Sequence, residues 1–263
     1  MSKVLQISGT MPGLSDANIP EEIIPFLVSH NLIPQLLSQR IIESAIAPIT
    51  CTQAETSHAL KQFYQHWDLT TAEKIQDWCL RYGLNPEQLE LLATRKLRVE
   101  KFKQITWGQQ IESYFLKRKR SLDRVIYSLM QTENKSIVNE LFFRIAEEED
   151  SFAELARKYS QGSEADRGGI IGPVELGSIT PNFAQLLYTS QVGVVQPPVA
   201  FGNSWIIVRV EKLISAQLDD FMRQRLLQEN FEAWFQEQLN QLSSEEKVWM
   251  GINPKSDQVQ EVA

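Results

Sequence analysis

Histidine and cysteine are scarce in this chain of 263 residues, which carries three histidines and two cysteines. Cys51 and Cys79 form no Cys-x-x-Cys pair, and neither has a histidine at a spacing typical of metal ligands. His58 and His66 lie two helical turns apart without a carboxylate or cysteine cluster, so we interpret them as ordinary surface or core residues. We therefore expect no metal site and no cofactor, and two free thiols that suit a reducing compartment.

Long apolar runs are also missing. The first ten residues are too short and too polar for the hydrophobic region of a signal peptide. The next apolar stretch, residues 19–37, is interrupted by Pro20, Pro25 and Pro34, which excludes a membrane-spanning helix. The sequence thus predicts no membrane insertion and a cytoplasmic location.

An excess of positive charge is absent as well. The 26 basic residues against 33 acidic ones give a net charge of -7, which argues against nucleic acid as a partner. The apolar fraction of 43% and the charged fraction of 22% are typical of a globular protein, and the length allows two modest domains. One local exception is the basic run at residues 117–120. We interpret it as a solvated helix face or hinge, with an electrostatic dock for an acidic segment as the alternative.

The N-terminal part of the chain has a helical pattern. Residues 1–20 are rich in Gly, Pro, Ser and Asn and predict a flexible leader, and residues 21–121 predict a helical domain. Thr52-x-x-Glu55 and Thr70-x-x-Glu73 are interpreted as capping boxes, and Asn85 before Pro86 marks a further helix start. The expected helices are residues 21–30, 33–47, 52–66, 72–82 and 86–119.

Residues 122–214 alternate between strand and helix patterns and predict a separate domain. The expected order is β-α-α-β-α-β-β, and its elements are residues 122–130, 134–149, a helix from 151, 168–175, 181–188, 195–200 and 205–213.

A long amphipathic helix is predicted over residues 215–244, followed by a polar tail at 245–263. Its apolar stripe includes Phe221, Phe231 and Trp234, and so much apolar area does not stay solvated alone. We expect this helix to pack on the N-terminal helices, which gives an α+β chain with a helical core built from both ends. An exposed dimerisation helix is the alternative.

Several short motifs follow one another within residues 122–214. They are Phe-Ala-Glu-Leu-Ala at 152–156, Tyr-Ser at 159–160, Gly-Gly-Ile-Ile-Gly at 168–172 and Phe-Gly at 201–202. This succession resembles the parvulin family of peptidyl-prolyl cis-trans isomerases (PpiC type). The predicted arrangement of helical core and inserted module is similar to chaperone-type parvulins of the SurA kind.

The resemblance implies an apolar slot that takes a proline ring. Its positions in this sequence are Ile171, Ile179, Phe183 and Phe201, which we call the slot residues. All four are apolar, so a proline-sized slot is physically reasonable. The alternative interpretation is that they form the core of a small α/β module.

The polar residues that the resemblance implies beside the slot differ in this sequence. Tyr127 stands at the position of the family's first-strand histidine, and the resemblance implies that it is the catalytic residue. Gly162 stands at the position of its cysteine or aspartate, and Ile206 lies near that of its last-strand histidine. Tyr127 with Ser160 or Ser163 could supply part of the missing hydrogen-bonding network, whereas glycine and isoleucine side chains cannot.

Isomerising an X-Pro bond requires no covalent step, only preferential binding of the twisted amide. The resemblance therefore implies a peptidyl-prolyl isomerase or foldase that binds unfolded or proline-containing polypeptides, with weak catalysis. The alternative is a non-catalytic chaperone or adaptor for a client protein, for example an export substrate. The sequence identifies neither the client nor a secretion partner.

Overall fold

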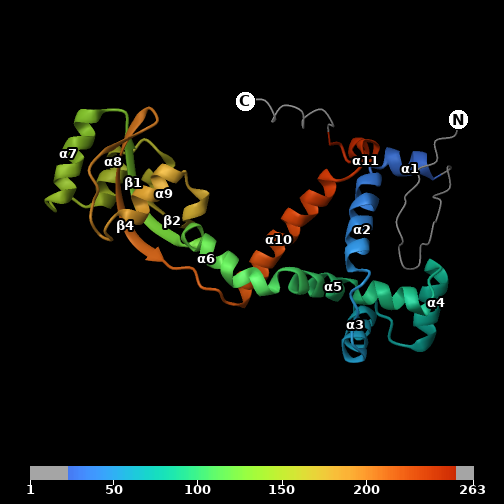
Figure 1. The fold of residues 1–263 in the computed structure, drawn as a ribbon. Helices are drawn as coiled ribbons and strands as arrows, with labels where there is room; N and C mark the ends of the chain where they lie inside the picture. Colours follow the sequence, from blue (N-terminus) through green and yellow to red (C-terminus); the bar gives the residue numbers. More distant parts are fainter. Residues whose placement is uncertain (1–22, 253–263) are drawn as a thin grey trace. The chain divides into compact units, whose positions relative to one another are not determined.

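The computed structural model of the protein describes residues 23–252 (Figure 1). The expected leader at 1–20 and the end of the expected tail lie outside the described residues. Contacts divide the chain into two units, residues 1–111 with 223–263 and residues 112–222. We call the described parts of these the helical unit and the sheet unit.

The helical unit is built from helices that start where the sequence provides caps. Thr52 forms the predicted capping box, and Asn85 begins a helix as predicted and also forms a capping box. The capping box expected at Thr70 is wrong, because Thr71 is the cap and its side chain accepts from the Lys74 N–H. The helices are α1 (Ile24–Ser29), α2 (Ile33–Ile46), α3 (Gln53–His66), α4 (Ala72–Tyr82), α5 (Pro86–Trp107), the one-turn η1 (Gly108–Gln110), most of α10 (Asp220–Asn240) and α11 (Ser244–Trp249).

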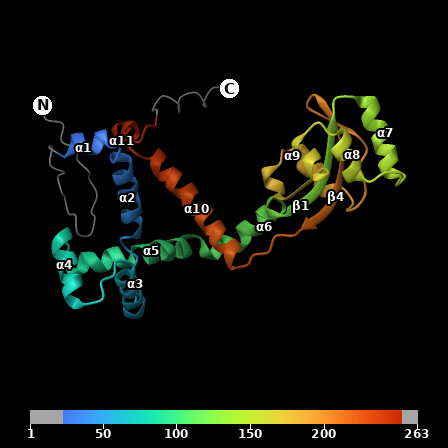
Figure 2. The ribbon, with the colours of Figure 1, turned by 180° about the vertical axis from the view of Figure 1, so that it is seen from behind.

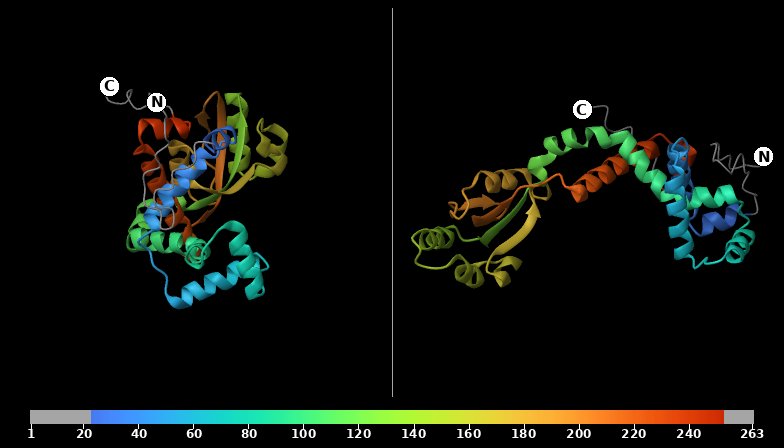
Figure 3. Two further views of the ribbon diagram at one scale, coloured as in Figure 1. Left: turned by 90° about the vertical axis from the view of Figure 1, so that its right-hand side faces the viewer. Right: turned by 90° about the horizontal axis from the view of Figure 1, so that it is seen from below.

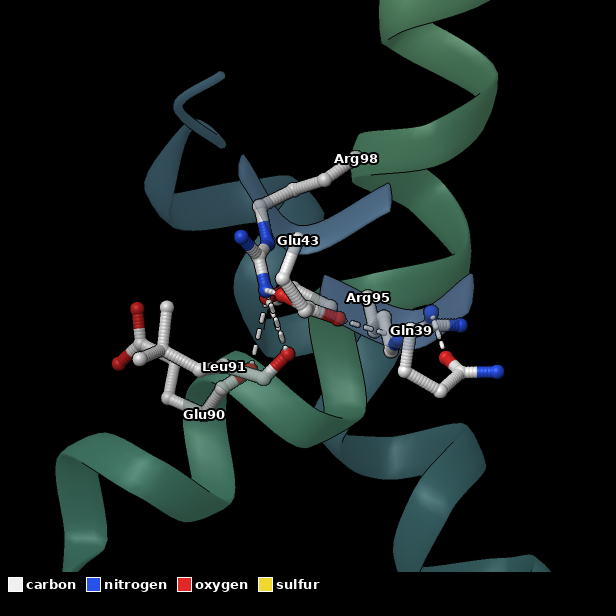
Figure 4. A network of polar contacts seen from close by, with 7 residues as sticks. Gln39, Glu43, Glu90, Leu91, Arg95 and Arg98 are labelled. Carbon is white, nitrogen blue, oxygen red and sulfur yellow. Dashed lines mark hydrogen bonds and ion pairs between the residues drawn. The ribbon is translucent and has the colours of Figure 1, made fainter. Parts of the chain in front are cut away.

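A polar network joins α2 to α5 inside the helical unit (Figure 4). Arg98 is 5% exposed, and its Nη2 lies 3.0 Å from the Leu91 carbonyl oxygen and 3.7 Å from Glu43 Oε2. Arg95 donates to the other oxygen of Glu43 and to Gln39. A buried guanidinium is costly unless it is paired, so the Glu43 carboxylate stabilises this packing of α2 on α5.

Aromatic side chains pack α10 on α5. The ring of Phe102 lies 5.1 Å from that of Trp234 and 6.3 Å from that of Phe231, measured between centroids. Lys103 Nζ lies 5.1 Å from the Phe231 centroid and donates to Gln228 at 2.7 Å. The prediction that the C-terminal helix packs on the N-terminal helices is confirmed.

The sheet unit contains a four-stranded antiparallel sheet in the order β2-β1-β4-β3. The chain order β-α-α-β-α-β-β and the α+β class are confirmed. The elements are α6 (Ile111–Leu122), β1 (Arg124–Thr132), α7 (Lys135–Ala146), α8 (Phe152–Tyr159), η2 (Ser163–Arg167), β2 (Ile170–Glu175), η3 (Leu176–Ser178), α9 (Pro181–Thr189), β3 (Val199–Phe201) and β4 (Ser204–Ile214).

Helices cover both faces of this sheet (Figures 2 and 3). On one face, residues of α7 and α8 such as Leu141 and Phe152 pack on Met130 and Ile207. On the other face, α9 packs on alternate residues of the same strands, and the buried members of this second cluster are Val125, Tyr127, Leu176, Phe183, Leu187, Ile206, Val208 and Val210. The sheet thus separates two apolar clusters, and the slot residues belong to the α9 side.

Three expected boundaries are wrong. The first strand begins at Arg124, because Leu122 ends α6 and is buried there at 1% exposure. The helix expected over 86–119 is interrupted at Gly108, since glycine is a weak helix former. Before β3, Val195 makes only an isolated bridge to Arg209 instead of starting a strand.

The C-terminal boundaries also differ from the prediction. The long helix covers residues 220–240 instead of 215–244, and the expected polar tail begins with the helix α11. Ser243 forms a capping box with Glu246, and Arg40 of α2 pairs with the same glutamate. These contacts explain why this polar segment is helical.

Candidate functional site

Three aromatic rings lie in a row on the α9 side of the sheet. The ring of Phe183 lies 5.6 Å from that of Tyr127, at an interplanar angle of 81°, and 5.4 Å from that of Phe201. Edge-to-face pairs of this kind add stability beyond the area that they bury. Tyr127 and Phe183 are 6% and 8% exposed, whereas Phe201 is 45% exposed. This aromatic trio therefore leads from the core of the sheet unit to its surface.

Ile171 and Ile179 border the trio. Ile171 lies opposite Tyr127 in the pairing of β2 with β1, and Ile179 directly follows η3, just before α9. Both are partly buried against the cluster that contains Phe183. The structure thus brings together the four slot residues and Tyr127, which are up to 74 positions apart in the chain, from 127 to 201.

Glycines position two of these side chains. Gly169 has a φ of 84°, and a Cβ there would lie 2.6 Å from the Leu129 carbonyl oxygen, so only glycine allows β2 to run this close to β1. Gly202 has a φ of 60° within the two-residue turn that joins β3 to β4. The first glycine lets Ile171 face Tyr127, and the second presents Phe201 at the end of β3.

The polar positions of the site are changed as the sequence predicts. Ile206 is 1% exposed and lies opposite Gln131 in the pairing of β4 with β1. Gly162 has an extended backbone with φ -99°, which any residue adopts. A Cβ on Gly162 would lie 2.1 Å from Glu164 Oε2 and 2.4 Å from Gln131 Nε2. The space beside Gly162 is thus filled by the side chains of Glu164 and Gln131.

Glu164 is the polar residue of this region that sequence analysis missed. It is 8% exposed, and Ser160 Oγ donates a hydrogen bond of 2.5 Å to its Oε1. Ser160 Oγ also accepts from the Gln131 N–H at 2.9 Å, which fixes the hydroxyl between β1 and η2. The Ser160 hydroxyl is therefore bonded to Gln131 and Glu164, whereas Ser163 is exposed. No sequence pattern marks an acidic loop residue as buried, so only the structure identifies Glu164.

The environment raises the pKa of the Tyr127 phenol. Burial is the larger cause, and the negative charge of Glu164 is the second. Tyr127 consequently stays protonated far above neutral pH and keeps a hydroxyl that donates a hydrogen bond.

The basic run at 117–120 has more structure than a solvated face. Lys119 Nζ donates to Asp123 at 3.0 Å and to Ser215 at 2.5 Å. The guanidinium carbon of Arg120 lies 4.3 Å from the ring centroid of Tyr188. At least these two basic side chains hold α6 against the rest of the sheet unit.

Over the described residues 23–252, no group of three His, Cys, Asp or Glu side chains is arranged to hold a metal ion. Within the same range, no helix is long and apolar enough to cross a membrane. Cys51 and Cys79 are free thiols, each partly buried.

Residues 127–212 match the family model of the rotamase, or PPIC-type PPIase, domain. A foldase protein PrsA of Caldanaerobacter subterraneus subsp. tengcongensis is 22% identical over 196 residues, which cover 73% of this chain and 60% of that protein. A chaperone SurA of Alkalilimnicola ehrlichii is 35% identical over 95 residues, 32% of this chain and 22% of that protein. A crystal structure of the peptidylprolyl isomerase PrsA from Bacillus cereus aligns over 90% of both chains with 17% identity and a TM-score of 0.44. The chain thus spans about three fifths of the PrsA relative and about a fifth of the SurA relative.

Proposed function

Since residues 127–212 belong to the PPIC-type peptidyl-prolyl isomerase family, we propose that this chain binds unfolded or proline-containing polypeptides and isomerises their X-Pro bonds slowly. The single observation that carries the proposal is the aromatic trio, in which Phe201 is 45% exposed and adjoins the buried ring of Phe183. An exposed aromatic next to partly buried isoleucines offers a proline ring apolar contact on several sides.

The trio supports binding of the twisted amide. When an X-Pro bond rotates, amide resonance is lost and the carbonyl group becomes less polar, so an apolar, water-excluding surface favours the twisted form over the planar one. Ile171 and Ile179 extend this surface around Phe183.

The polar side of the site supports only slow turnover. Ile206 and Gly162 carry no side-chain donor or acceptor, so neither stabilises the prolyl nitrogen as it becomes basic. Of the three positions where the family has polar side chains, Tyr127 alone carries a hydrogen-bond donor in this sequence, its hydroxyl group. We therefore assign the larger part of the function to binding and the smaller part to catalysis.

The test is a pair of assays on the purified chain. One measures cis-trans isomerisation of X-Pro tetrapeptides, and the other measures suppression of aggregation of an unfolded client protein. We expect a small acceleration of isomerisation together with clear suppression. Turnover as rapid as that of an isomerase with an intact histidine pair would contradict the weak-catalysis part, and the absence of both effects would contradict the function as a whole.

A second candidate function is that of a non-catalytic chaperone or adaptor that holds its client, for example an export substrate, on the helical unit. One observation favours it: Trp67 and Tyr82 are 48% and 57% exposed and belong to an aromatic cluster with Phe63 and Trp78. A hollow of about 370 Å³ beside it is lined in part by Tyr64. Substitution of Trp67 and Tyr82 by serine should abolish aggregation suppression under this alternative and leave it largely intact under the first proposal.

A cytoplasmic location is part of the proposal. The free thiols of Cys51 and Cys79 support it, because thiols persist in a reducing compartment. Cell fractionation with thiol trapping tests this directly. Recovery of the chain with periplasmic, membrane or secreted proteins would contradict it.

A further inference from the structure

The sheet unit contains a largely buried glutamate that pairs with no basic side chain of the described residues. Glu164 is 8% exposed, and no basic side chain pairs with it anywhere in residues 23–252. Its one hydrogen-bond donor there is the neutral hydroxyl of Ser160, which binds Oε1, so Oε2 has no donor among the described residues. The buried side-chain atoms without a partner among the described residues are Trp78 Nε1 and Arg98 Nε, so the unbonded Oε2 of Glu164 is not fully buried and is open to a cation from outside the chain.

Gly162 makes room for this carboxylate. A Cβ at position 162 would lie 2.1 Å from Glu164 Oε2 and 2.5 Å from Oε1, so any larger residue would displace the side chain. The backbone of Gly162 is extended, with φ -99° and ψ 171°, and does not itself require glycine. The glycine is therefore explained by the positions of Glu164 and of Gln131, whose Nε2 would lie 2.4 Å from the same Cβ.

The carboxylate lies near the slot residues. Gln131, whose Nε2 is close to Gly162, lies opposite Ile206, which belongs to the apolar cluster of Tyr127 and Phe183. The charge of Glu164 also acts on Tyr127, whose ring is 5.6 Å from that of Phe183.

Resting on the proposed peptide-binding function, we propose that Glu164 selects polypeptides in which a lysine or arginine directly precedes the proline. The proline ring occupies the slot, and the basic side chain supplies the counter-charge that Glu164 lacks. Arginine fits best, because its planar group donates two parallel hydrogen bonds and Glu164 Oε2 is open to accept. An acidic residue before the proline is disfavoured by repulsion.

The experiment measures dissociation constants of three peptides that differ only in the residue before proline, which is Arg, Gln or Glu. The full chain is compared with Glu164→Gln, which keeps the volume of the side chain and an acceptor for Ser160. For the parent we expect the Arg peptide to bind about tenfold more tightly than the Gln peptide, and the Glu peptide to bind least. Glu164→Gln should bind all three with similar affinity. Asp166→Asn, an exposed acid in the same short helix η2, is the matched control and should keep the parent's order.

A relocated carboxylate provides the second test. Glu164→Ala removes the carboxylate beside position 162, and Gly162→Asp puts one back at nearly the same place once the flexible end of Gln131, 2.4 Å from the new Cβ, moves aside. The double variant should regain the preference for arginine that Glu164→Ala alone loses, and this recovery would not follow if Glu164 only stabilised the fold. If Glu164→Gln fails to fold, the affinities of the double variant for the three peptides still test the proposal.

The two hypotheses fail in different ways. Equal binding of the three peptides by the parent overturns the role of Glu164 and leaves the proposed function standing. If none of the peptides binds, the proposed function falls, and the role of Glu164 falls with it. An unchanged order of affinities in Glu164→Gln also overturns the inference.

Discussion

Phe183 contacts a buried ring on one side and an exposed ring on the other. At 8% exposure it belongs to the core of the sheet unit, yet its neighbour Phe201 is 45% exposed. The side chain of Phe183 thus contributes both to the stability of the module and to the proposed binding surface. Single substitutions here must separate these two contributions.

Phe183→Ala should weaken binding of an uncharged proline-rich peptide by about 1–3 kcal/mol, the free energy of burying a large apolar side chain. Isothermal titration measures the affinity, and near-UV circular dichroism checks the fold. The control is Phe143→Ala, which removes an equal ring that is 58% exposed on α7, across the sheet. A folded Phe183→Ala protein with the parent's affinity would show that proline binds elsewhere.

The structure brings together the apolar residues that the sequence predicts for the site, and their role in binding stays a prediction. Ile171, Ile179, Phe183 and Phe201 follow from motif positions, and the structure brings them together with Tyr127. Glu164 was missed, because the burial of a carboxylate in the short helix η2 depends on the space that Gly162 leaves beside it in the folded chain. Patterns along the chain carry no such information.

At the scale of helices and strands, the predicted boundaries are correct where contacts between neighbouring residues alone determine where an element begins. The caps at Thr52 and Asn85 predict helix starts correctly, since their hydrogen bonds join residues only three apart. The sequence predicts Leu122 in a strand, because an apolar residue fits the helical and the strand periodicity equally well. The structure shows that Leu122 is buried at the end of α6. The helix α11 was missed, since part of its stability comes from Arg40, about two hundred residues away.

The ion pair between Arg40 and Glu246 makes the stability of α11 depend on pH. Burial raises the pKa of Glu246, but the hydrogen bonds from Arg40 and Ser243 outweigh burial and hold this pKa below its ordinary value. A lowered pKa in the folded state contributes stability above the unfolded pKa of about 4.3, and this stability is lost as the pH falls through the folded value.

Glu246→Gln should therefore lower the melting temperature at pH 7 by about 2 °C, a modest effect because the pair is partly exposed. The difference from the parent should shrink as the pH falls below about 4. Glu237→Gln, at an exposed position of α10, is the control and should melt like the parent at every pH. A difference that stays constant from pH 7 to pH 3 would exclude the ionised pair as its cause. Differential scanning calorimetry across this range measures the effect.

At the scale of the whole molecule, the two ends of the chain share one helical unit, and the sheet unit lies between them in sequence. The rings of Phe231 and Trp234 on α10 pack on Phe102 and Trp107 of α5. This burial joins segments more than a hundred positions apart. The amphipathic stripe of the C-terminal helix made this pairing predictable, although not the individual partners.

Deletion of residues 220–263 should unfold or aggregate the N-terminal helices, because the rings of α5 lose the apolar cover that α10 provides. Residues 112–222 produced alone should still fold, since they contain the sheet and both of its apolar clusters. Far-UV circular dichroism and thermal melting measure both products. A soluble truncated chain with the parent's helicity per residue and melting temperature would contradict the shared helical unit.

The most direct test of the central claim is an isoleucine-methyl NMR titration of the full chain with an uncharged proline-rich peptide. Ile171 and Ile179 report on the slot, and Ile33 and Ile46, both buried in the helical unit, are internal controls. If the sheet unit binds proline through the slot residues, the methyl signals of Ile171 and Ile179 should shift in a saturable manner while those of Ile33 and Ile46 stay unchanged. Saturable shifts confined to the helical unit, with Ile171 and Ile179 unaffected, would contradict the account.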